Sequence, residues 1–217
     1  MRIPVASPAY RYLIPLVLLT VITGLKVFSF FYLFLFLTIF ITFFYRDPVR
    51  KAPIGDDIIL APADGRIMSI EKVCEESFVR EETIRIRIFL SIFDVHINRS
   101  PFAGTILFQQ HIPGSYIAAY REQAPQVNER NLIGFTTAYG KILVVQIAGK
   151  VARRIVSWIE TGDTIAAGAR IGMIKFGSCT EIYLPAGVAI NVKEGECVRG
   201  GETVLGKFQG ESAQTDP

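Results

Sequence analysis

The sequence has little cysteine, little histidine and little charge. Its three cysteines, Cys74, Cys179 and Cys197, form no C-x-x-C pair, and its two histidines are His96 and His111. An odd number of cysteines favours free thiols in a reducing compartment over a disulfide framework. A four-ligand zinc site would need nearly all of these side chains, at spacings unlike those of common sites, so we expect no metal.

The charge is also divided unevenly along the chain. Only 20% of the 217 residues are charged and 50% are apolar, which excludes a disordered chain. Residues 1–51 hold six basic residues and one acidic residue, whereas residues 52–217 hold 17 basic and 19 acidic residues. The net charge of +3 therefore reflects a basic N-terminal segment, and we expect no nucleic-acid partner.

The apolar excess is concentrated near the N-terminus. Between Arg11 and Arg46 the only charged residue is Lys26, which separates 14 residues, Tyr12–Leu25, from 19 residues, Val27–Tyr45. The second stretch is long enough to span a bilayer, and the basic residues after it favour a cytoplasmic location for the rest of the chain. The first stretch is short, so a second span and a re-entrant or interfacial helix both remain open.

Residues 52–217 have the texture of a β-rich domain, with short β-branched runs separated by Gly, Pro and Asp. The predicted strands are Ile58–Leu60, Arg66–Ile70, Thr83–Leu90, Gly104–Gln110, Ile133–Thr137, Lys141–Ile147 and Ile171–Lys175. We expect one helical turn at Tyr116–Arg121 and a loop at Gln123–Asn131. Alternation along Thr83–Arg87 predicts that Arg85 and Arg87 lie on a solvent-exposed face.

A repeat with a spacing of 33 residues marks the C-terminal part. Its two copies are Gly162, Ile165, Gly168, Ile171 and Gly195, Val198, Gly201, Val204. In each copy an acidic residue follows the first glycine. Two copies are too few for a solenoid, and they suit two quasi-symmetric strand-turn-strand units of a small barrel or sandwich. Residues 173–191 would connect these units.

Four short motifs contain residue types that are suited to chemistry. They are Ala61-Pro62-Ala63-Asp64-Gly65, Asp94-Val95-His96-Ile97-Asn98-Arg99, Asn128-Glu129-Arg130 and Phe176-Gly177-Ser178. Taken singly, Pro-Ala-Asp-Gly and Gly-Ser are typical of turns, and a lone histidine is more often structural than catalytic. Their order along one chain is more informative than any single motif.

That order, after an apolar N-terminal segment and Phe43-Phe44-Tyr45-Arg46-Asp47-Pro48, resembles the phosphatidylserine decarboxylase proenzymes, in particular their short bacterial and archaeal branch. The resemblance extends from Phe43 to about Gly206. It implies a mainly β fold, with a compact body like the barrel-sandwich of biotinyl and lipoyl carrier domains. We therefore expect a helical membrane anchor at 1–51 and a catalytic domain at 52–217.

The resemblance also implies that the chain cuts itself between Gly177 and Ser178. Attack of the Ser178 hydroxyl on the Gly177 carbonyl, followed by β-elimination and hydrolysis, would leave a pyruvoyl group at position 178. This covalent cofactor would form a Schiff base with the serine amine of phosphatidylserine and accept the electrons released with carbon dioxide. The product would be phosphatidylethanolamine, and the two chains would stay associated at the cell membrane.

Further roles follow from the same resemblance. Asp64 matches the aspartate of a charge relay for self-cleavage, and His96 matches the acid/base group of decarboxylation. Arg99 stands where longer members have a second histidine. An arginine cannot act as an ordinary base, so the base for self-cleavage is left open, and we assign Arg99 to binding the phosphate or carboxylate of the headgroup. Asn128-Glu129-Arg130 would brace the site, and His111 would be structural.

Two alternatives stay open from the sequence. The first is an archaetidylserine-type decarboxylase, because no motif distinguishes acyl from ether lipids. The second is a membrane-tethered carrier or binding module with the same β fold, for which Lys175 is the nearest candidate for modification. The sequence also leaves open whether the chain forms a homo-oligomer.

Overall fold

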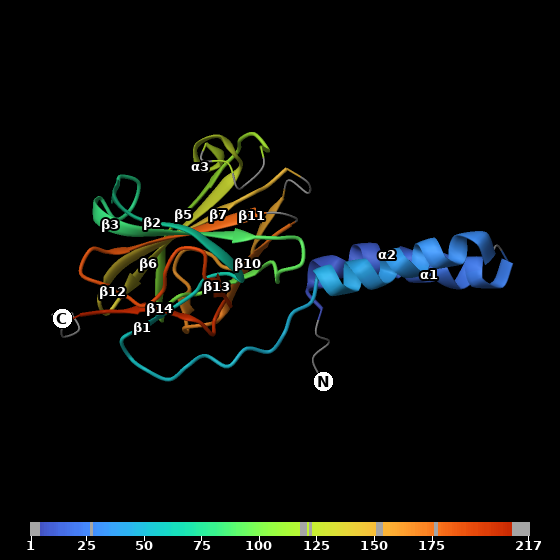
Figure 1. Ribbon diagram of the computed structural model, residues 1–217, viewed down its shortest axis with the longest axis horizontal. Coiled ribbons are helices and arrows are strands. Elements are labelled where there is room, and N and C mark those ends of the chain that lie inside the picture. The colour runs from blue at the N-terminus through green and yellow to red at the C-terminus, as the bar shows by residue number, and fades with distance from the viewer. Residues whose placement is uncertain are drawn as a thin grey trace. The chain divides into compact units, whose positions relative to one another are not determined.

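The computed structural model describes residues 5–26, 28–117, 121, 123–150, 154–175 and 178–209 (Figure 1). The chain divides into two compact units, Met1–Val49 and Arg50–Pro217. This division lies two residues before the boundary that we expected after residue 51.

The N-terminal unit is a pair of antiparallel apolar helices. A short 3-10 helix, η1 (Ser7–Ala9), leads into α1 (Tyr10–Lys26), which lies against α2 (Phe28–Phe44). Each of the two α-helices has 17 residues and so extends about 26 Å, which is near the lower limit for crossing a bilayer. Thr20 and Thr38 hydrogen-bond across the pair through their hydroxyls, at 3.2 Å.

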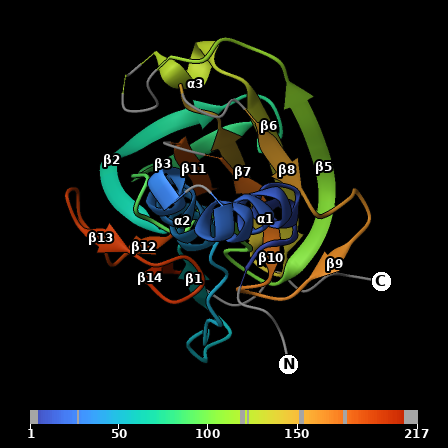
Figure 2. The same ribbon diagram turned by 90° about the vertical axis from the view of Figure 1, so that its right-hand side faces the viewer.

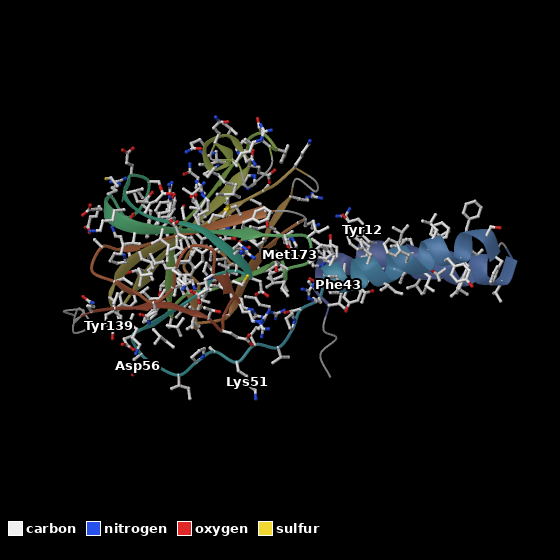
Figure 3. The ribbon with its side chains drawn as sticks, viewed as in Figure 1. Tyr12, Phe43, Lys51, Asp56, Tyr139 and Met173 are labelled. Carbon is white, nitrogen blue, oxygen red and sulfur yellow. The ribbon has the colours of Figure 1, made fainter. Side chains whose placement is uncertain are left out.

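The surface of this helix pair suits a membrane. Most of its large apolar side chains project outward, as Figure 3 shows for Tyr12 and Phe43, and Leu25, Phe28 and Phe36 are 80%, 65% and 63% exposed. The polar threonine hydroxyls bond within their own helices to the carbonyl four residues earlier, so lipid would meet few unsatisfied polar groups. The structure therefore has the apolar N-terminal helix from which the sequence predicted membrane association.

The sequence indicated that Val27–Tyr45 is long enough to span a membrane and left open whether Tyr12–Leu25 forms a second span. In the described residues, Ser7–Leu25 is instead the helix that is long and apolar enough to cross a membrane, and Phe28–Phe44 is a shorter apolar helix. The difference arises because η1 continues the first helix toward the N-terminus, with Pro8 in its first turn.

The second unit is built from antiparallel strands. The strands are β1 Ile58–Leu60, β2 Gly65–Glu75, β3 Glu81–Leu90, β4 Ile97–Arg99, β5 Gly104–Ile112, β6 Arg130–Thr137, β7 Gly140–Ile147, β8 Ile155–Ser157, β9 Thr164–Ile165, β10 Arg170–Ile174, β11 Ser178–Pro185, β12 Ala189–Ile190, β13 Cys197–Val198 and β14 Val204–Lys207. Within the described residues they form a large sheet, β13-β2-β3-β11-β7-β6-β5-β9, and two small sheets, β1-β14-β12 and β4-β10-β8. The large sheet curls into a half-barrel, and β2 and β5 are the long curved strands at its two sides (Figure 2).

The core fills the inside of this curl. Ile86 and Ile88 of β3, Ile133 of β6 and Ile182 of β11 are fully buried, and they pack in one cluster with Leu205 of β14. The alternation of isoleucines along β3 therefore places them inside the barrel, as a half-buried strand requires. The predicted mainly β fold with an apolar helical N-terminus is confirmed.

The repeat corresponds to two equivalent turns. Gly162 and Gly195 both have positive φ, 100° and 83°, which a side chain would oppose. The N–H of Gly162 donates to the Ile106 carbonyl (2.8 Å) and that of Gly195 donates to the Ile67 carbonyl (2.9 Å). The two copies thus close the starts of β5 and β2 in the same way, as the quasi-symmetric units predicted.

Other local predictions were wrong. A helical turn, α3, lies at Ala124–Val127 inside the expected loop. The helical turn expected at Tyr116–Arg121 falls on residues 118–120, which lie outside the described residues, so it stays a prediction. Residues 173–191 are more than a connection, because they contain β11. Arg87 is not on a wet face: it is 6% exposed and pairs at 2.9 Å with Glu181, which is 1% exposed. A second apolar cluster covers this side of the sheet.

Candidate active site

Ser178 is the first residue of β11, the strand between β3 and β7. It lies opposite Leu90 of β3, and its side chain is completely buried. Its Oγ has no hydrogen-bond partner in the described part of the chain. A buried hydroxyl is normally bonded, so an orphaned one at this position is a candidate nucleophile. Gly177, the other residue of the predicted cleavage site, lies outside the described residues, as does Phe176.

The neighbouring thiol is not a competing nucleophile. Cys179 is fully buried between Phe89 and Ile147 of the flanking strands. Burial, with a contribution from the nearby Glu181 carboxylate, strongly raises the pKa of the Cys179 thiol. Because a thiol reacts as the thiolate, Cys179 is inert at neutral pH.

His96 lies in the loop between β3 and β4 and is fully buried. Its Nδ1 is 2.9 Å from the backbone oxygen of Asp94. A carbonyl oxygen only accepts, so Nδ1 carries the proton and Nε2 is the nitrogen that can take up another. The His96 carbonyl accepts from the Ile174 N–H at 3.1 Å, which ties this loop to the end of β10. Three residues separate Ile174 from Ser178 in the sequence.

Asp64 lies between β1 and β2, and both of its carboxylate oxygens are engaged. Oδ2 accepts from Arg50 Nη2 at 2.6 Å, and Oδ1 accepts from the Gly200 N–H at 2.8 Å. Arg50 also donates to Glu202 at 2.8 Å, and its side chain is only 10% exposed. Burial raises the pKa of the Asp64 carboxyl, while Arg50 and the Gly200 N–H act in the opposite direction. The cation that stabilises the charge of Asp64 is therefore Arg50.

Arg99 is 7% exposed, and its Nη1 donates to the Gly168 carbonyl at 3.0 Å. Its Cδ lies so close to Gly201 that an added Cβ there would approach within 2.8 Å. Arg99 thus packs against the two equivalent glycines of the repeat. Its predicted contact with a headgroup has no counterpart among these interactions and stays a prediction.

A chain of buried amides connects the motif around His96 to β11. Asn98 donates to the Thr180 hydroxyl at 2.9 Å and accepts from Gln146 Nε2 at 2.8 Å. Gln146 in turn accepts from Asn131 Nδ2 at 3.0 Å. All four side chains are at most 2% exposed. Gly172 of β10 leaves the room they need, because a Cβ there would lie 2.9 Å from Gln146 Nε2.

Asp64 lies in the wall of an open cleft of about 580 Å³. Its lining residues are Asp64, Gly65, Arg66, Phe89, Ser91, Asp94, Cys197, Val198 and Arg199. It therefore presents two carboxylates and two guanidinium groups around a partly apolar wall. Phe89 and Ser91 flank Leu90, the residue opposite Ser178, so the cleft and the start of β11 share one end of β3.

The Asn128-Glu129-Arg130 motif shapes a loop. The Asn128 side chain is fully buried, accepts from the Ile117 N–H at 2.9 Å and donates to the Ile117 carbonyl at 2.9 Å and the Ala148 carbonyl at 2.8 Å. Glu129 accepts from the Tyr116 hydroxyl at 2.6 Å. His111 is about half exposed and lies 3.6 Å from Glu129, and its structural role stays a prediction.

The geometry argues against a carrier module. A lysine that is modified by a carrier ligase must be exposed at the tip of a hairpin, but Lys175 is 3% exposed. It lies between β10 and β11, and its N–H donates to the Arg154 carbonyl at 3.2 Å.

Some site residues were not singled out from the sequence. In the sequence, Arg50 stands out only as a basic residue that follows an apolar stretch. Gln146 lies inside the predicted strand Lys141–Ile147, and Asn131 lies just before the predicted strand Ile133–Thr137. A glutamine within an otherwise apolar strand, such as Lys141–Ile147, is the signal that could have indicated a buried polar contact.

The comparisons with known proteins agree on one family. Residues 37–206 match the family described as Phosphatidylserine decarboxylase. A protein of Carboxydothermus hydrogenoformans named phosphatidylserine decarboxylase proenzyme is 44% identical over 202 residues, which cover 93% of this chain and 95% of that protein. Proteins of the same name from Symbiobacterium thermophilum and Desulfotalea psychrophila are 44% and 43% identical, over 79% and 82% of this chain and 80% and 83% of their own lengths.

Replacing the central amide should destabilise the body. Gln146→Leu leaves Asn98 Oδ1 without its donor and Asn131 Nδ2 without its acceptor, and we expect it to lower the free energy of unfolding by about 2–4 kcal/mol. Gln110→Leu, at an exposed position of β5, should change it by less than about 0.5 kcal/mol. Urea denaturation in detergent measures both, and equal effects would show that the amide chain is not a significant stabilising network.

Removing Arg50 should make the ionisation of Asp64 less favourable. Because Arg50 opposes the effect of burial, Arg50→Met should raise the pKa of the Asp64 carboxyl further. The folded state then binds this proton more tightly than the unfolded state, so the variant loses stability as the pH rises above about 4 and through the raised pKa.

The measurement is the thermal midpoint at pH 4 and at pH 7. The deficit of Arg50→Met relative to the unmodified chain should be larger at pH 7, whereas Arg50→Lys, which keeps the positive charge, should show a smaller difference. A deficit that is the same at both pH values would contradict the assigned electrostatic role.

Proposed function

The chain belongs to the phosphatidylserine decarboxylase family, and from this premise we propose that it converts phosphatidylserine to phosphatidylethanolamine with a pyruvoyl group made from its own Ser178. The observation that carries the proposal is the fully buried Ser178 Oγ, which has no hydrogen-bond partner in the described residues and begins a central strand. The serine directly follows Gly177, as the cleavage chemistry of the predicted site requires.

The first reaction is self-cleavage. The Ser178 Oγ attacks the Gly177 carbonyl carbon, the amide nitrogen leaves and takes up the hydroxyl proton, and an ester replaces the peptide bond. Removal of the Ser178 Cα proton then expels the Gly177 carboxylate, which becomes the end of the longer chain. Addition of water to the remaining dehydroalanine releases ammonia and leaves a ketone at position 178. A glycine before the serine suits the attack, because no side chain obstructs it.

A ketone at position 178 would supply an electron sink for the electron pair that is left on the substrate when carbon dioxide departs. The chain's own groups handle the protons. His96 Nε2 takes a proton from the substrate ammonium, which frees the amine, and returns it to the carbon that loses carbon dioxide. The bond from Nδ1 to the Asp94 carbonyl keeps the ring in the tautomer that this exchange needs.

Asp64 has a separate role in this scheme. We assign it to self-cleavage, in which its carboxylate stabilises positive charge that develops near Ser178. The pairing with Arg50 supports an ionised Asp64 at neutral pH despite its burial. Arg50 is thus the positioning residue for this carboxylate.

The cleft offers a place for the headgroup. A phosphoserine headgroup carries negative phosphate and carboxylate groups and a positive amine, and the cleft presents Arg66, Arg199 and Asp94. We keep Arg99 as a further contact for phosphate or carboxylate, since a guanidinium group binds such groups in a bidentate geometry. The basic residues that follow α2 favour a body on the cytoplasmic face of the cell membrane.

The sheet supports continued association of the two chains. A cut before Ser178 would leave β11 with register pairs to β3 from Ser178 to Pro185 and to β7 from Cys179 to Tyr183. These ladders do not involve the broken bond, so the 40-residue chain 178–217 would stay bound to residues 1–177.

Intact mass spectrometry tests the cleavage. The purified protein should appear as two chains, 1–177 and 178–217, with a ketone in place of the N-terminal amine of the shorter one. Ser178→Ala should leave a single uncut chain without decarboxylase activity, whereas Ser157→Ala, at an exposed serine of β8, should be cut normally. A folded unmodified protein that stays a single chain of 217 residues would refute the proposal.

Substitution of the histidine should separate the two reactions. His96→Ala removes the proton-exchanging nitrogen, so we expect decarboxylation to slow by about 100-fold or more while the chain is still cut. His111→Ala is the matched control, since it alters an exposed histidine, and should turn over normally. Carbon dioxide release measured on equal amounts of cleaved protein provides the comparison, and full activity of His96→Ala would exclude this assignment.

A further inference from the structure

The loop after β3 presents two apolar side chains at the tip of a rigid turn. In Ser91–Asp94, the Asp94 N–H donates to the Ser91 carbonyl at 3.0 Å. The Asp94 carboxylate accepts from the Ser91 N–H at 2.8 Å and from the Ser91 hydroxyl at 2.7 Å. Three hydrogen bonds therefore close the turn and hold Ile92 and Phe93 at its two corners.

We call Ile92 and Phe93 the apolar tip, and both are exposed to solvent beside the cleft. Ile92 is 39% exposed and Phe93 is 65% exposed. Single exposed apolar residues are common on soluble proteins and by themselves indicate little. Here, however, the residues on either side, Ser91 and Asp94, both line the cleft. The apolar tip therefore stands at the rim of the cleft that we assign to a lipid headgroup.

The polar surroundings suit the surface of a bilayer. Arg66 and Arg199 of the cleft are exposed, and guanidinium groups are attracted to the anionic headgroups of a membrane. Arg50, which is bonded to Asp64 of the same cleft, follows the end of α2 by only six residues. A body tethered to an apolar helix by so short a segment stays at the membrane surface.

We propose that Ile92 and Phe93 insert into the lipid bilayer beside the cleft, as a second membrane contact that is separate from the N-terminal helices. The choice of a lipid surface as the occupant rests on the proposed function. Insertion would hold the mouth of the cleft against the headgroup layer, so that a lipid enters without leaving the membrane. The cost of exposing Phe93 to water is thereby removed.

The same turn reaches the catalytic histidine. The backbone carbonyl of Asp94 accepts from His96 Nδ1 at 2.9 Å, while its carboxylate closes the turn at Ser91. One short segment therefore carries the membrane contact, part of the cleft wall and the anchor of His96. A lipid bound next to the apolar tip lies beside the group that exchanges protons with it.

Fluorescence quenching by brominated lipid tests insertion without any turnover. The full chain carrying Phe93→Trp and Trp158→Phe is reconstituted into phospholipid vesicles whose acyl chains are brominated. Insertion should make quenching of the new tryptophan about threefold stronger than that of Leu107→Trp in the same background. Leu107 is the matched control because it is 53% exposed on β5 and does not line the cleft. Equal quenching at the two positions would overturn the proposal.

Turnover then separates this inference from the proposed function. Ile92→Ser with Phe93→Ser should lower kcat/KM for phosphatidylserine in vesicles by about fivefold or more, because the apolar contact is lost. Turnover of a water-soluble, short-chain phosphatidylserine should be unchanged, and Leu107→Ser should behave like the unmodified chain with both substrates.

The possible results are distinct. Equal activity of the double variant and the unmodified chain on vesicles would refute insertion of the apolar tip while leaving the decarboxylase assignment intact. Absence of turnover by the cleaved, unmodified chain with either substrate would refute the proposed function, and the quenching experiment would still decide whether the tip enters the bilayer.

Discussion

Strand β11 hydrogen-bonds to β3 on one side and β7 on the other, and its polar side chains must therefore find partners inside the protein. Thr180 is bonded by Asn98, and Glu181 is paired with Arg87 at 2.9 Å. Such partners are needed because a buried polar group without one would cost about 1–3 kcal/mol. Both partners come from distant parts of the chain. Among the buried polar side chains of β11, Ser178 at the start of the strand is the one whose oxygen has no partner in the described residues. The polar side chains of β11 that follow Ser178 thus have partners inside the protein, and Ser178 is held at the start of a strand that is paired on both sides.

The two halves of the barrel are built alike but carry different chemistry. The N–H of Gly201 donates to the Ala61 carbonyl and that of Gly168 donates to the Ser100 carbonyl, both at 2.9 Å. By this equivalence Asp64 corresponds to Ala103, since each lies three residues after the accepting carbonyl and one before the glycine that begins a long strand. The same backbone turn is therefore purely structural in one half, and in the other it holds a carboxylate beside the cleft.

Much of the fold could be predicted from local sequence patterns. β1 was predicted with its observed bounds, and β3, β7 and β10 were predicted to within about two residues, because alternating β-branched residues specify a strand and its buried face locally. β11 was missed because it is buried on both faces, with Glu181 and Thr180 satisfied by other strands, so it lacks that alternation. The wet face predicted for Arg87 failed for the same reason, since period-two alternation does not show whether a second apolar cluster covers the polar side.

The sequence by itself determined the β-rich class, the apolar N-terminal segment, the paired glycine turns and the order of motifs that identifies the family. These are properties of neighbouring residues: hydrophobic periodicity, the length of an apolar run, and the tolerance of glycine for positive φ. The tertiary structure alone decided that Arg50 neutralises Asp64, that Asn98 and Gln146 support β11, and that Ile92 and Phe93 stand at the rim of the cleft. The contacts behind the first two join residues 14, 48 and 82 positions apart. Such pairings depend on which strands become neighbours in the curled sheet, and strand order is set by burial of the whole core rather than by any local pattern.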